Sequence, residues 1–548
     1  MDDFGIWGII PPALTIVLAL VTKDVILSLF VGIFSGAMIV AGGNPALAMM
    51  NLTDTLASSL ADSWNIRIFM FCGLLGALVG MLAKTGAAWA FGQWASKRVK
   101  TKAGALLFTW FFGLIIFIDD YFNSLTIGTV MRPITDENRV SRAKLAYILD
   151  STAAPVCIIA PISSWVVTVM SYIKSSKGFD QLEISEFAYF IQVIPYNIYA
   201  LFAIIMVVFI AVSGRDFGPM RRSEERAASG EGLFNKERFG EAAGSVSEEH
   251  NNSKAHFSDM LMPIGLLIIL AVIFFPVTTW MAAAKSSALI NGQAVDSFKA
   301  AMLAIPLGKA FNDTDASVAL MYAMVVTIAI TYIYYIGRKL LSVKTAANAM
   351  IEGFKSMVPA LIILTLAWSI GSIIKSSPAD GGLGLANYLS HLVVDGGFQI
   401  YLLPVVVFML SCLISFSTGT SWGTLAIMVP ITMPISVALG QAAGFDGTEL
   451  LNASLAPLGA VLGGAIFGDH ASPISDTTIL SSTGANCPHL EHVATQLPYA
   501  GFVAVVAIIG HITAGLTRQP YVSLGVAAFV FISGLFFLTR NKKSDYAQ

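Results

Sequence analysis

The sequence predicts an all-α polytopic membrane protein, and three observations lead to this fold class. Only 12% of the 548 residues are charged, whereas a soluble globular protein carries roughly 25%. Long apolar runs recur along the chain, and most are near or above the ~20 residues that a helix needs to cross a bilayer. The 47 glycines and the mean hydropathy of +0.74 agree, because glycine is commoner in membrane helices than in soluble ones.

Hydropathy predicts about eleven transmembrane helices, at 6–21, 25–41, 66–83, 143–172, 188–213, 259–277, 317–337, 357–376, 450–485, 497–517 and 521–539. Two further apolar regions, 104–136 and 399–434, each consist of an apolar arm, a polar tip and a second short arm. This pattern is typical of re-entrant hairpins, because irregular backbone at membrane depth is tolerated only inside protein or beside a wet cavity.

The basic residues predict the orientation of these helices. If the N-terminus lies outside, 24 of the 32 Lys and Arg residues fall on the cytoplasmic side, as the positive-inside rule requires. We therefore expect a multi-pass protein of a bacterial-type plasma (inner) membrane, with the C-terminus in the cytoplasm. The acidic start at Asp2 and Asp3 does not resemble a signal peptide, and the net charge of −2 excludes a strongly basic nucleic-acid binder.

The polar segment 215–258 divides the chain into two halves and reads as a solvated cytoplasmic linker. Residues 1–214 are expected to form one repeat, with hairpin 104–136 and broken helix 143–172. Residues 259–517 are expected to form a second, with hairpin 399–434 and broken helix 450–485. Residues 518–548 would add a final helix and a cytoplasmic tail.

Short matches support the repeat. Gly80–Lys84 resembles Gly371–Lys375, and Met131–Thr135 resembles Met428–Thr432. Five predicted crossings separate each segment from its equivalent, so the second copy is inverted. Inverted repeats are an architecture of secondary transporters, whose sites lie near the bilayer midplane.

The hairpin tips concentrate oxygen-bearing side chains where a helix must break. These oxygens suit a hard cation such as Na⁺, and the free helix ends at a break can also bind ions or a substrate. The alternative for the hydroxyl residues is helix capping and turn formation. The candidate ligands are Asn123, Ser124 and Thr126 in the first tip and Ser417, Thr418, Thr420 and Ser421 in the second.

Each broken helix carries carboxylates beside proline: Asp150 precedes Pro155, while Asp469, His470 and Asp476 surround Pro473. A charged side chain at bilayer depth costs at least ~2.5–3.5 kcal/mol, so a functional role is the first reading. A structural cap at the opened helix is the alternative for Asp150 and Asp469.

Two adjacent acids, Asp119 and Asp120, also lie at depth. One of two neighbouring carboxylates in a low dielectric tends to hold a proton, although one may instead face a basic partner.

The remaining ionisable and sulfur-bearing side chains are predicted to be structural. Lys84 and Lys375 are expected to snorkel to the interfaces, and His511 to pack inside the bundle. His489 and His492 lack further zinc ligands at suitable spacing, so we expect both in a loop. The cysteines, Cys72, Cys157, Cys412 and Cys487, are too far apart in sequence for a metal motif and are expected to be small packing residues.

Three strings resemble the NhaC-type sodium/proton antiporter family: Phe117–Thr126, Leu149–Pro155 and Phe467–Thr478. The resemblance implies the broad ion-transporter superfamily, with inverted repeats, two re-entrant hairpins, a dimerising scaffold and an elevator-like transport domain. Residues that match the family's motifs are Asp119, Asp120, Asn123, Ser124, Thr126, Asp150, Asp469, His470, Ser472, Asp476 and Thr477.

The first functional hypothesis is a secondary transporter that exchanges Na⁺ for H⁺ by alternating access. Asp119, Asp120, Asp150, Asp469, His470 and Asp476 would couple protons and ions, while the hydroxyl and amide residues of the tips, with Ser472 and Thr477, would bind Na⁺ or substrate. The alternative is Na⁺-coupled transport of a small organic solute, an amino acid or a carboxylate, beside Asn123, Tyr121 and Trp422. An enzyme or a channel is not expected, nor any cofactor beyond the transported ions.

Overall fold

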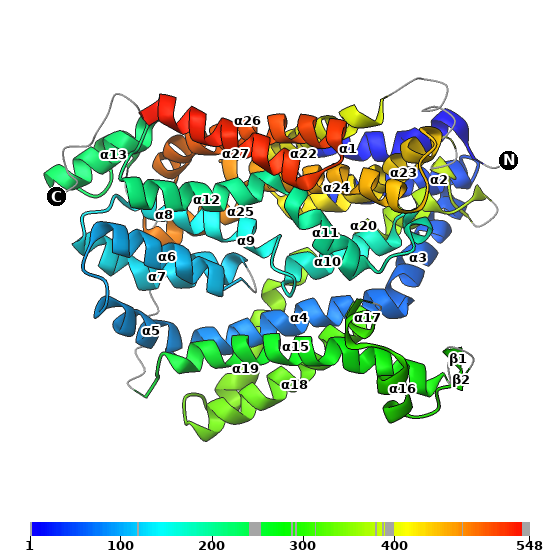
Figure 1. Ribbon diagram of the computed structural model, residues 1–548, viewed down its shortest axis with the longest axis horizontal. Coiled ribbons are helices and arrows are strands. Elements are labelled where there is room, and N and C mark those ends of the chain that lie inside the picture. Colours follow the sequence, from blue (N-terminus) through cyan, green and yellow to red (C-terminus); the bar gives the residue numbers. More distant parts are fainter. Residues whose placement is uncertain are drawn as a thin grey trace.

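The computed structural model in Figure 1 is a bundle of helices, many of which run close to its long axis. The two termini lie at opposite ends of that axis. The structure describes residues 3–22, 24–117, 120–240, 254–286, 289–290, 293–312, 314–378, 381–385, 388, 399–473 and 475–539.

The first part of the chain is helical throughout its regular elements. They are η1 (Gly5–Ile9), α1 (Ile10–Thr22), α2 (Val25–Val40), α3 (Pro45–Ala61), α4 (Ser63–Lys84), α5 (Ala87–Ser96), α6 (Lys102–Ile115), α7 (Asp120–Glu137), α8 (Arg142–Thr152), α9 (Ala154–Cys157), α10 (Ser164–Ser175), η2 (Phe179–Leu182), α11 (Glu186–Val193), η3 (Ile194–Tyr196), α12 (Ile198–Ser213), α13 (Gly218–Ser229) and α14 (Lys236–Phe239).

The second part adds one small hairpin of strands, β1 (Leu289–Ile290) paired antiparallel with β2 (Gln293–Ala294). Its helices are α15 (Ser258–Lys285), α16 (Phe298–Ala304), α17 (Leu307–Asn312), α18 (Ala316–Gly337), α19 (Val343–Ser356), α20 (Val358–Lys375), η5 (Ile400–Leu402), α22 (Leu403–Thr418), α23 (Ser421–Ala442), α24 (Gly447–Ala471), α25 (Asp476–Ala485), α26 (His489–Thr517) and α27 (Pro520–Thr539).

The all-helical membrane architecture is confirmed in outline. Nine helical stretches of the described residues are long and apolar enough to cross a bilayer, or ten if the bent pair α19–α20 forms one span. They are Ser63–Lys84, Ile198–Ser229, Ser258–Lys285, Ala316–Gly337, Ile400–Thr418, Ser421–Ala442, Gly447–Ala471, His489–Thr517 and Pro520–Thr539. The count differs from eleven partly because α1 and α2 have only 13 and 16 residues, and partly because both arms of region 399–434 are long.

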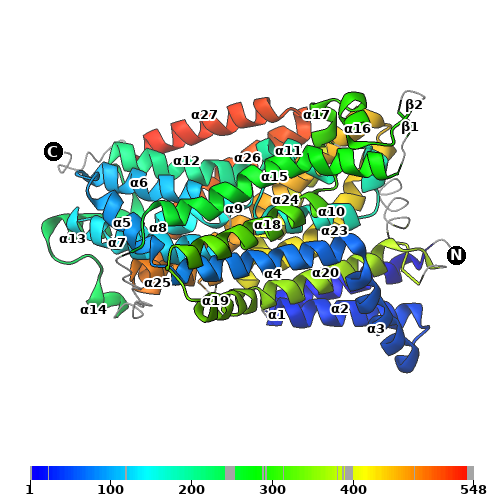
Figure 2. The same ribbon diagram turned by 90° about the horizontal axis from the view of Figure 1, so that it is seen from below.

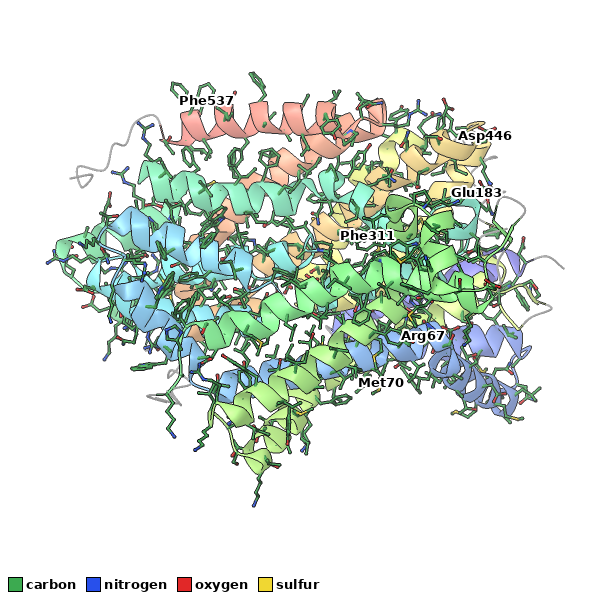
Figure 3. All side chains as sticks on the ribbon, turned by 60° about the horizontal axis from the view of Figure 1, so that its bottom comes forward. Arg67, Met70, Glu183, Phe311, Asp446 and Phe537 are labelled. Atoms are coloured by element: carbon green, nitrogen blue, oxygen red, sulfur yellow. The ribbon has the colours of Figure 1, made fainter. Side chains whose placement is uncertain are left out.

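The outer surface is apolar, as a lipid environment requires. Along α27 the side chains of Phe529, Ile532, Phe536 and Phe537 are more than half exposed, and Phe537 points away from the bundle in Figure 3. Because a soluble protein rarely exposes so large a continuous apolar face, this helix faces lipid.

Four long helices, α4, α15, α18 and α19, pack together along one side of the molecule, the lower side in Figure 1. Small residues make this packing close: a Cβ atom added at Gly353 of α19 would lie 2.0 Å from the Gly76 carbonyl oxygen of α4. Such small-residue contacts are typical of helix packing in membranes. Lys84, predicted to snorkel, lies 3.5 Å from Glu352 at this interface, and the Lys375 side chain lies outside the described part.

The remaining helices form the other side, where two stretches share an order of elements. In the first, α6 and α7 are joined by a short break, and the next helix is interrupted between α8, α9 and α10. In the second, α22 and α23 are joined at Gly419 and Thr420, and the next helix is interrupted between α24 and α25. Figure 2 shows α25 beside α7 and α8 although more than 300 residues separate them in the sequence.

The interruptions follow local sequence. Ser141 begins α8, where its hydroxyl accepts a hydrogen bond from the Lys144 N–H group, and Ser475 begins α25 in the same way through Thr478. Serine is a favoured residue at both positions because it satisfies an N–H group that has no partner in the first turn. Pro155 stands in the first turn of α9, where a missing N–H costs little.

The segment 215–258 is less solvated than its composition suggests. Its first part folds into α13, which packs on α8 and α26. Glu224 of α13 is buried and lies 2.8 Å from the ammonium group of Lys144 on α8. A chain of mixed charge can therefore be ordered here, because partners from distant helices satisfy its charges.

The loop position predicted for His489 and His492 is wrong. Both residues lie in the first turns of α26, which begins directly after Pro488. The absence of zinc ligands carries no information on secondary structure, and Pro488 fits its place before the helix because its missing N–H group costs no helical hydrogen bond there. His511 is buried against Phe408, with ring centroids 5.0 Å apart, and neither ring nitrogen has a hydrogen-bond partner among the described residues.

Candidate ion-binding site

Asp150 and Asp469 occupy equivalent places in the two interrupted helices. Asp150 lies two residues before the end of α8, and Asp469 lies two residues before the end of α24. Both side chains are buried, with 1% and 2% of their surface exposed. Two carboxylates thus stand inside the bundle at points where the backbone leaves its helical path.

The carboxylate of Asp150 has three neighbours from two other helices. Its Oδ2 atom accepts hydrogen bonds from Gln496 Nε2 at 2.6 Å and from Thr478 Oγ1 at 3.1 Å. The Nε2 atom of His492 lies 3.9 Å away. Its Oδ1 atom has no hydrogen-bond partner among the described residues, so one oxygen of a buried carboxylate is available to a cation.

The carboxylate of Asp469 lies between the second hairpin tip and the start of α25. Ser421 Oγ is 2.8 Å from Asp469 Oδ2, and the hydroxyl of Ser475 donates a hydrogen bond to Oδ1. The same Thr478 hydroxyl that contacts Asp150 is 3.3 Å from the Asp469 carbonyl oxygen. The two acidic residues therefore meet at one helix end.

That helix end is the N-terminus of α25, which carries three hydroxyl groups in its first turn. Ser475 caps the helix, Thr477 Oγ1 lies 2.9 Å from Ser475 Oγ, and Thr478 reaches toward both acidic residues. The N-terminus of a helix is the positive end of its dipole, so it partly stabilises negative charge there. Ser475, Thr477 and Thr478 thus place three hydroxyl oxygens at this helix end, and oxygen is the ligand type that hard cations prefer.

The His470 side chain contacts neither carboxylate by a described hydrogen bond. It instead joins α24 to α12 and α8. Its Nδ1 atom is 2.8 Å from the Tyr199 hydroxyl of α12, and its Nε2 atom is 3.1 Å from Ser151 Oγ of α8. The ring is stacked with that of Tyr147. Its backbone carbonyl accepts a hydrogen bond from the Gln496 amide.

The first hairpin tip is joined to α8 and α25. Asn123 Nδ2 lies within hydrogen-bonding distance of the Ile116 and Thr152 carbonyl oxygens, at 2.8 and 3.1 Å. Ser124 Oγ accepts a hydrogen bond from Ser481 Oγ of α25 at 3.1 Å. Thr126 is half-buried on the same helix.

Asp120 opens α7 and lies on the side of the site that faces the second tip. Its Oδ1 atom accepts a hydrogen bond from Trp165 Nε1 at 2.9 Å. The Trp165 ring in turn contacts that of Trp422, with centroids 4.9 Å apart. An indole N–H group, rather than a basic side chain, therefore faces this carboxylate oxygen.

The second hairpin tip contributes less than expected. The Thr418 hydroxyl donates a hydrogen bond to the Ile414 carbonyl oxygen, four residues earlier in its own helix, at 2.9 Å. Ser417 and Thr420 are half-buried, and only Ser421 of the four reaches an acidic residue by a described hydrogen bond. Ser472 holds the tip through the Phe416 carbonyl oxygen at 2.8 Å.

Two of the predicted acids are not described fully. Asp119 lies outside the described residues, and of Asp476 only the backbone, at the first position of α25, is described. Gln496, Thr478, Ser151 and Tyr199 were not among the residues predicted from the sequence, and Ser475 was considered only as a nucleophile in the enzyme alternative. The spacing of His492 and Gln496, four residues apart on one helix face, is the signal that was available, and the two side chains are indeed hydrogen-bonded at 2.8 Å.

The charge balance of the site is unusual. In the part of the chain that the structure describes, Asp150 has no lysine or arginine partner, and its one ion-pair neighbour is His492. No group of three or more His, Cys, Asp or Glu side chains suited to a metal ion occurs among the described residues. The atoms around the two acids are mainly hydroxyl, carbonyl and carboxylate oxygens, together with the Gln496 amide and the His492 ring nitrogen, and hard cations prefer oxygen ligands.

Comparison with known proteins identifies the family of this chain. The sequence model described as "Na+/H+ antiporter family" matches residues 156–516. A Haemophilus influenzae protein described as uncharacterized is 37% identical over 98% of this chain and 97% of its own length.

Two further relatives match over shorter regions. The malate-2H(+)/Na(+)-lactate antiporter of Bacillus subtilis is 32% identical over 28% of this chain and 30% of its own length. A protein named as an uncharacterized Na(+)/H(+) antiporter of Haemophilus influenzae is 31% identical over 30% of this chain and 32% of its own length. With two thirds of its residues matched by the family model, this chain belongs to the Na⁺/H⁺ antiporter family.

Proposed function

We propose that this protein, a secondary transporter by its family, exchanges Na⁺ for H⁺ across the plasma membrane. In this proposal Asp150 and Asp469 hold Na⁺ and protons in turn. Ser421, Thr477 and Thr478 supply neutral oxygen ligands, and Asp120 lies at the entrance between the two hairpin tips.

One observation carries the proposal: the two buried acids converge on the N-terminus of α25. There the Thr478 hydroxyl contacts the Asp150 carboxylate and the Asp469 backbone carbonyl oxygen, and the Ser475 hydroxyl donates to the Asp469 carboxylate. Two ionised carboxylates in a region of low dielectric repel each other, and each loses its hydration when buried. A cation must therefore accompany the two carboxylates. Because no lysine or arginine is paired to Asp150 in the described structure, a proton or Na⁺ is that cation in this proposal. Competition of the two cations for the same oxygens is sufficient for exchange.

The architecture suggests how exchange and access are coupled. The matching order of α6–α10 and α22–α25 supports two inverted repeats with re-entrant hairpins. On this proposal the group α4, α15, α18 and α19 belongs to a scaffold that pairs with a second copy, while the hairpins and interrupted helices move as an elevator-like unit. The N-terminus would lie outside and α13 in the cytoplasm, in agreement with the basic residues.

The direct test uses the purified protein in proteoliposomes that contain a pH-sensitive dye. An inward Na⁺ gradient should raise the luminal pH, because entering Na⁺ drives protons out, whereas an equal K⁺ gradient should not. The proposal is wrong if neither ion moves protons.

A second arm of the same assay tests for an organic solute. The Bacillus subtilis relative is named for malate and lactate, so small carboxylates and amino acids are added on either side. If Na⁺-driven proton movement appears only when one of these solutes is present, the protein is instead a Na⁺-coupled carrier of that solute.

A further inference from the structure

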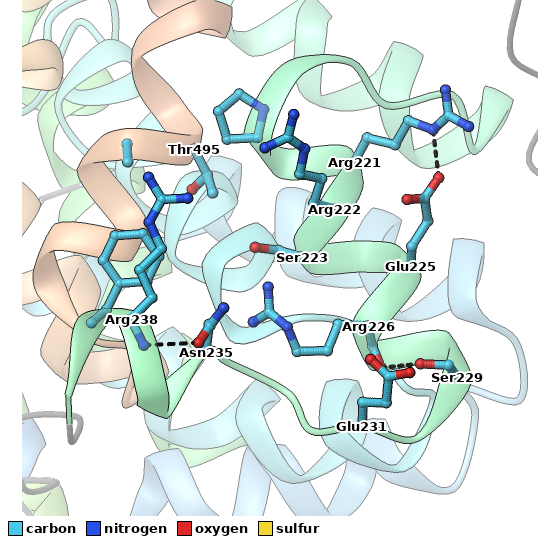
Figure 4. Close-up of a pocket in the computed structure, with 13 residues that line it drawn as sticks. Arg221, Arg222, Ser223, Glu225, Arg226, Ser229, Glu231, Asn235, Arg238 and Thr495 are labelled. Atoms are coloured by element: carbon cyan, nitrogen blue, oxygen red, sulfur yellow. Dashed lines mark hydrogen bonds and ion pairs between the residues drawn. The ribbon is translucent and has the colours of Figure 1, made fainter.

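A cavity of about 720 Å³ lies outside the ion site, between α13, α14 and the beginning of α26. Figure 4 shows it with α13 on one side and Asn235, Arg238 and Thr495 on the other. Ligand pockets in proteins generally measure ~300–1,000 Å³, so this space admits a molecule of nucleotide size and not only a single ion.

The lining of the cavity is strongly basic. Four arginines contribute to it, Arg221, Arg222, Arg226 and Arg238, against two glutamates, Glu225 and Glu231. Arginine binds phosphate and carboxylate groups through a planar fork of N–H donors, whereas lysine acts as a point charge. All basic residues that line the cavity are arginines, a choice that the positive-inside rule alone does not require.

Only two of the four arginines form ion pairs among the described residues. Arg221 turns toward Glu225, with Nε 2.6 Å from the carboxylate, and Arg226 donates one N–H group to Glu491 at 3.1 Å. Arg222 and Arg238 form no ion pair among the described residues and extend on opposite sides of the space in Figure 4. Two guanidinium groups without an acidic partner among the described residues therefore line one cavity, and that of Arg238 also lies over the Phe239 ring, 5.1 Å from its centroid.

Neutral groups complete the pocket. Asn235 offers an amide and Phe239 an aromatic ring at the α14 side. From these observations we propose that the cavity binds a phosphate-bearing anion, through Arg222, Arg226 and Arg238. A soluble nucleotide-like molecule and an anionic lipid headgroup present the same phosphate oxygens to the arginines, and the experiment below distinguishes these two sources.

The position of the pocket gives such an anion an effect on the ion site. Glu491, the partner of Arg226, is buried and also accepts hydrogen bonds from Ser223 Oγ and the Asn235 N–H group, each at 2.7 Å. Gln496, which binds Asp150, lies five residues further along α26, or about 7.5 Å at 1.5 Å per residue. An anion that recruits Arg226 weakens its ion pair with Glu491 at the start of α26, the helix whose Gln496 contacts Asp150.

The test measures binding, so its outcome is independent of the transport assay. The full-length protein is placed in phosphatidylcholine nanodiscs without Na⁺, and thermal unfolding is followed with choline salts of inorganic phosphate or ATP. A parallel series uses nanodiscs that contain phosphatidylglycerol and no soluble phosphate. The variant R222Q/R238Q removes the two unpaired guanidinium groups, and K97Q/R98Q makes the same charge change on an exposed part of the chain beyond the cavity.

A soluble ligand is supported if ATP stabilises the wild-type protein and R222Q/R238Q lowers the apparent affinity for ATP at least about tenfold. K97Q/R98Q should leave that affinity unchanged. The same pattern with phosphatidylglycerol alone supports a lipid headgroup. The proposal is overturned if none of inorganic phosphate, ATP and phosphatidylglycerol stabilises the protein. It is also overturned if both variants respond to these probes as the wild type does.

Discussion

Gln496 of α26 donates a hydrogen bond from its Nε2 atom to Oδ2 of Asp150 on α8, over 2.6 Å. The same nitrogen contacts the backbone carbonyl of His470 on α24. One amide thus joins the helix ends of both interrupted segments. This contact makes Gln496 a positioning residue for the acid that the proposed exchange depends on.

Gln496→Leu tests this contact, because leucine has a similar size but no N–H donor. Hydrogen bonds to charged groups contribute about 1.5–3 kcal/mol, so the free energy of unfolding should fall by about that amount. Thermal unfolding in detergent measures the change. Gln441→Leu is the matched control, since Gln441 is exposed and contacts only Gln181 by a described side-chain bond; equal losses in the two variants would show that the Asp150 contact adds nothing.

Gly484→Ala tests the close approach of α25 to the first hairpin tip. A Cβ atom at Gly484 would lie 2.5 Å from the Ser124 carbonyl oxygen, so α7 and α25 must separate. Overpacking of this kind typically costs ~1–3 kcal/mol. Gly501→Ala is the control, because nothing lies within 4 Å of a Cβ atom there and alanine favours a helix by up to ~1 kcal/mol. A Gly484→Ala protein as stable and as active as the control would contradict the tight packing.

Lys144→Met tests the ion-pair cluster that fixes α13 to α8. Lys144 is buried and lies 2.6 Å from Asp216 and 2.8 Å from Glu224. Loss of one partner of a buried pair leaves uncompensated charge and costs about 3–5 kcal/mol. The double variant Lys144→Met/Asp216→Asn removes one of those charges, so it should regain part of the loss in an unfolding measurement. No recovery would mean that the two residues do not interact energetically.

The sequence was most informative where a charge stands out against an apolar background. Asp150 and Asp469 could be predicted as a pair because each is a carboxylate beside proline within a long apolar segment, and the structure brings both to the N-terminus of α25. The sequence also predicted that regions 104–136 and 399–434 each contain two helical arms with a break between them, because polar tips interrupt the apolar pattern.

Uncharged partners were much harder to predict. Gln496 and Thr478 carry no charge that distinguishes them in the sequence, and only the fold reveals that they face Asp150. The ion pair of Lys144 with Glu224 joins residues 80 positions apart, a distance over which hydropathy carries no pairing information. The hydroxyl of Thr418 bonds within its own helix, an arrangement that the sequence left open beside an ion-binding role.

The central claim is that Asp150 and Asp469 carry Na⁺ and protons in turn. The measurement that tests it most directly is Na⁺-driven proton movement in proteoliposomes of Asp150→Asn and Asp469→Asn, beside the control Asp446→Asn. Asp446 is exposed just before α24, and its side chain makes no cap there. The account predicts that exchange disappears in the first two variants, with their folded fraction unchanged, and persists in the third. Exchange at the wild-type rate in both Asp150→Asn and Asp469→Asn would contradict it.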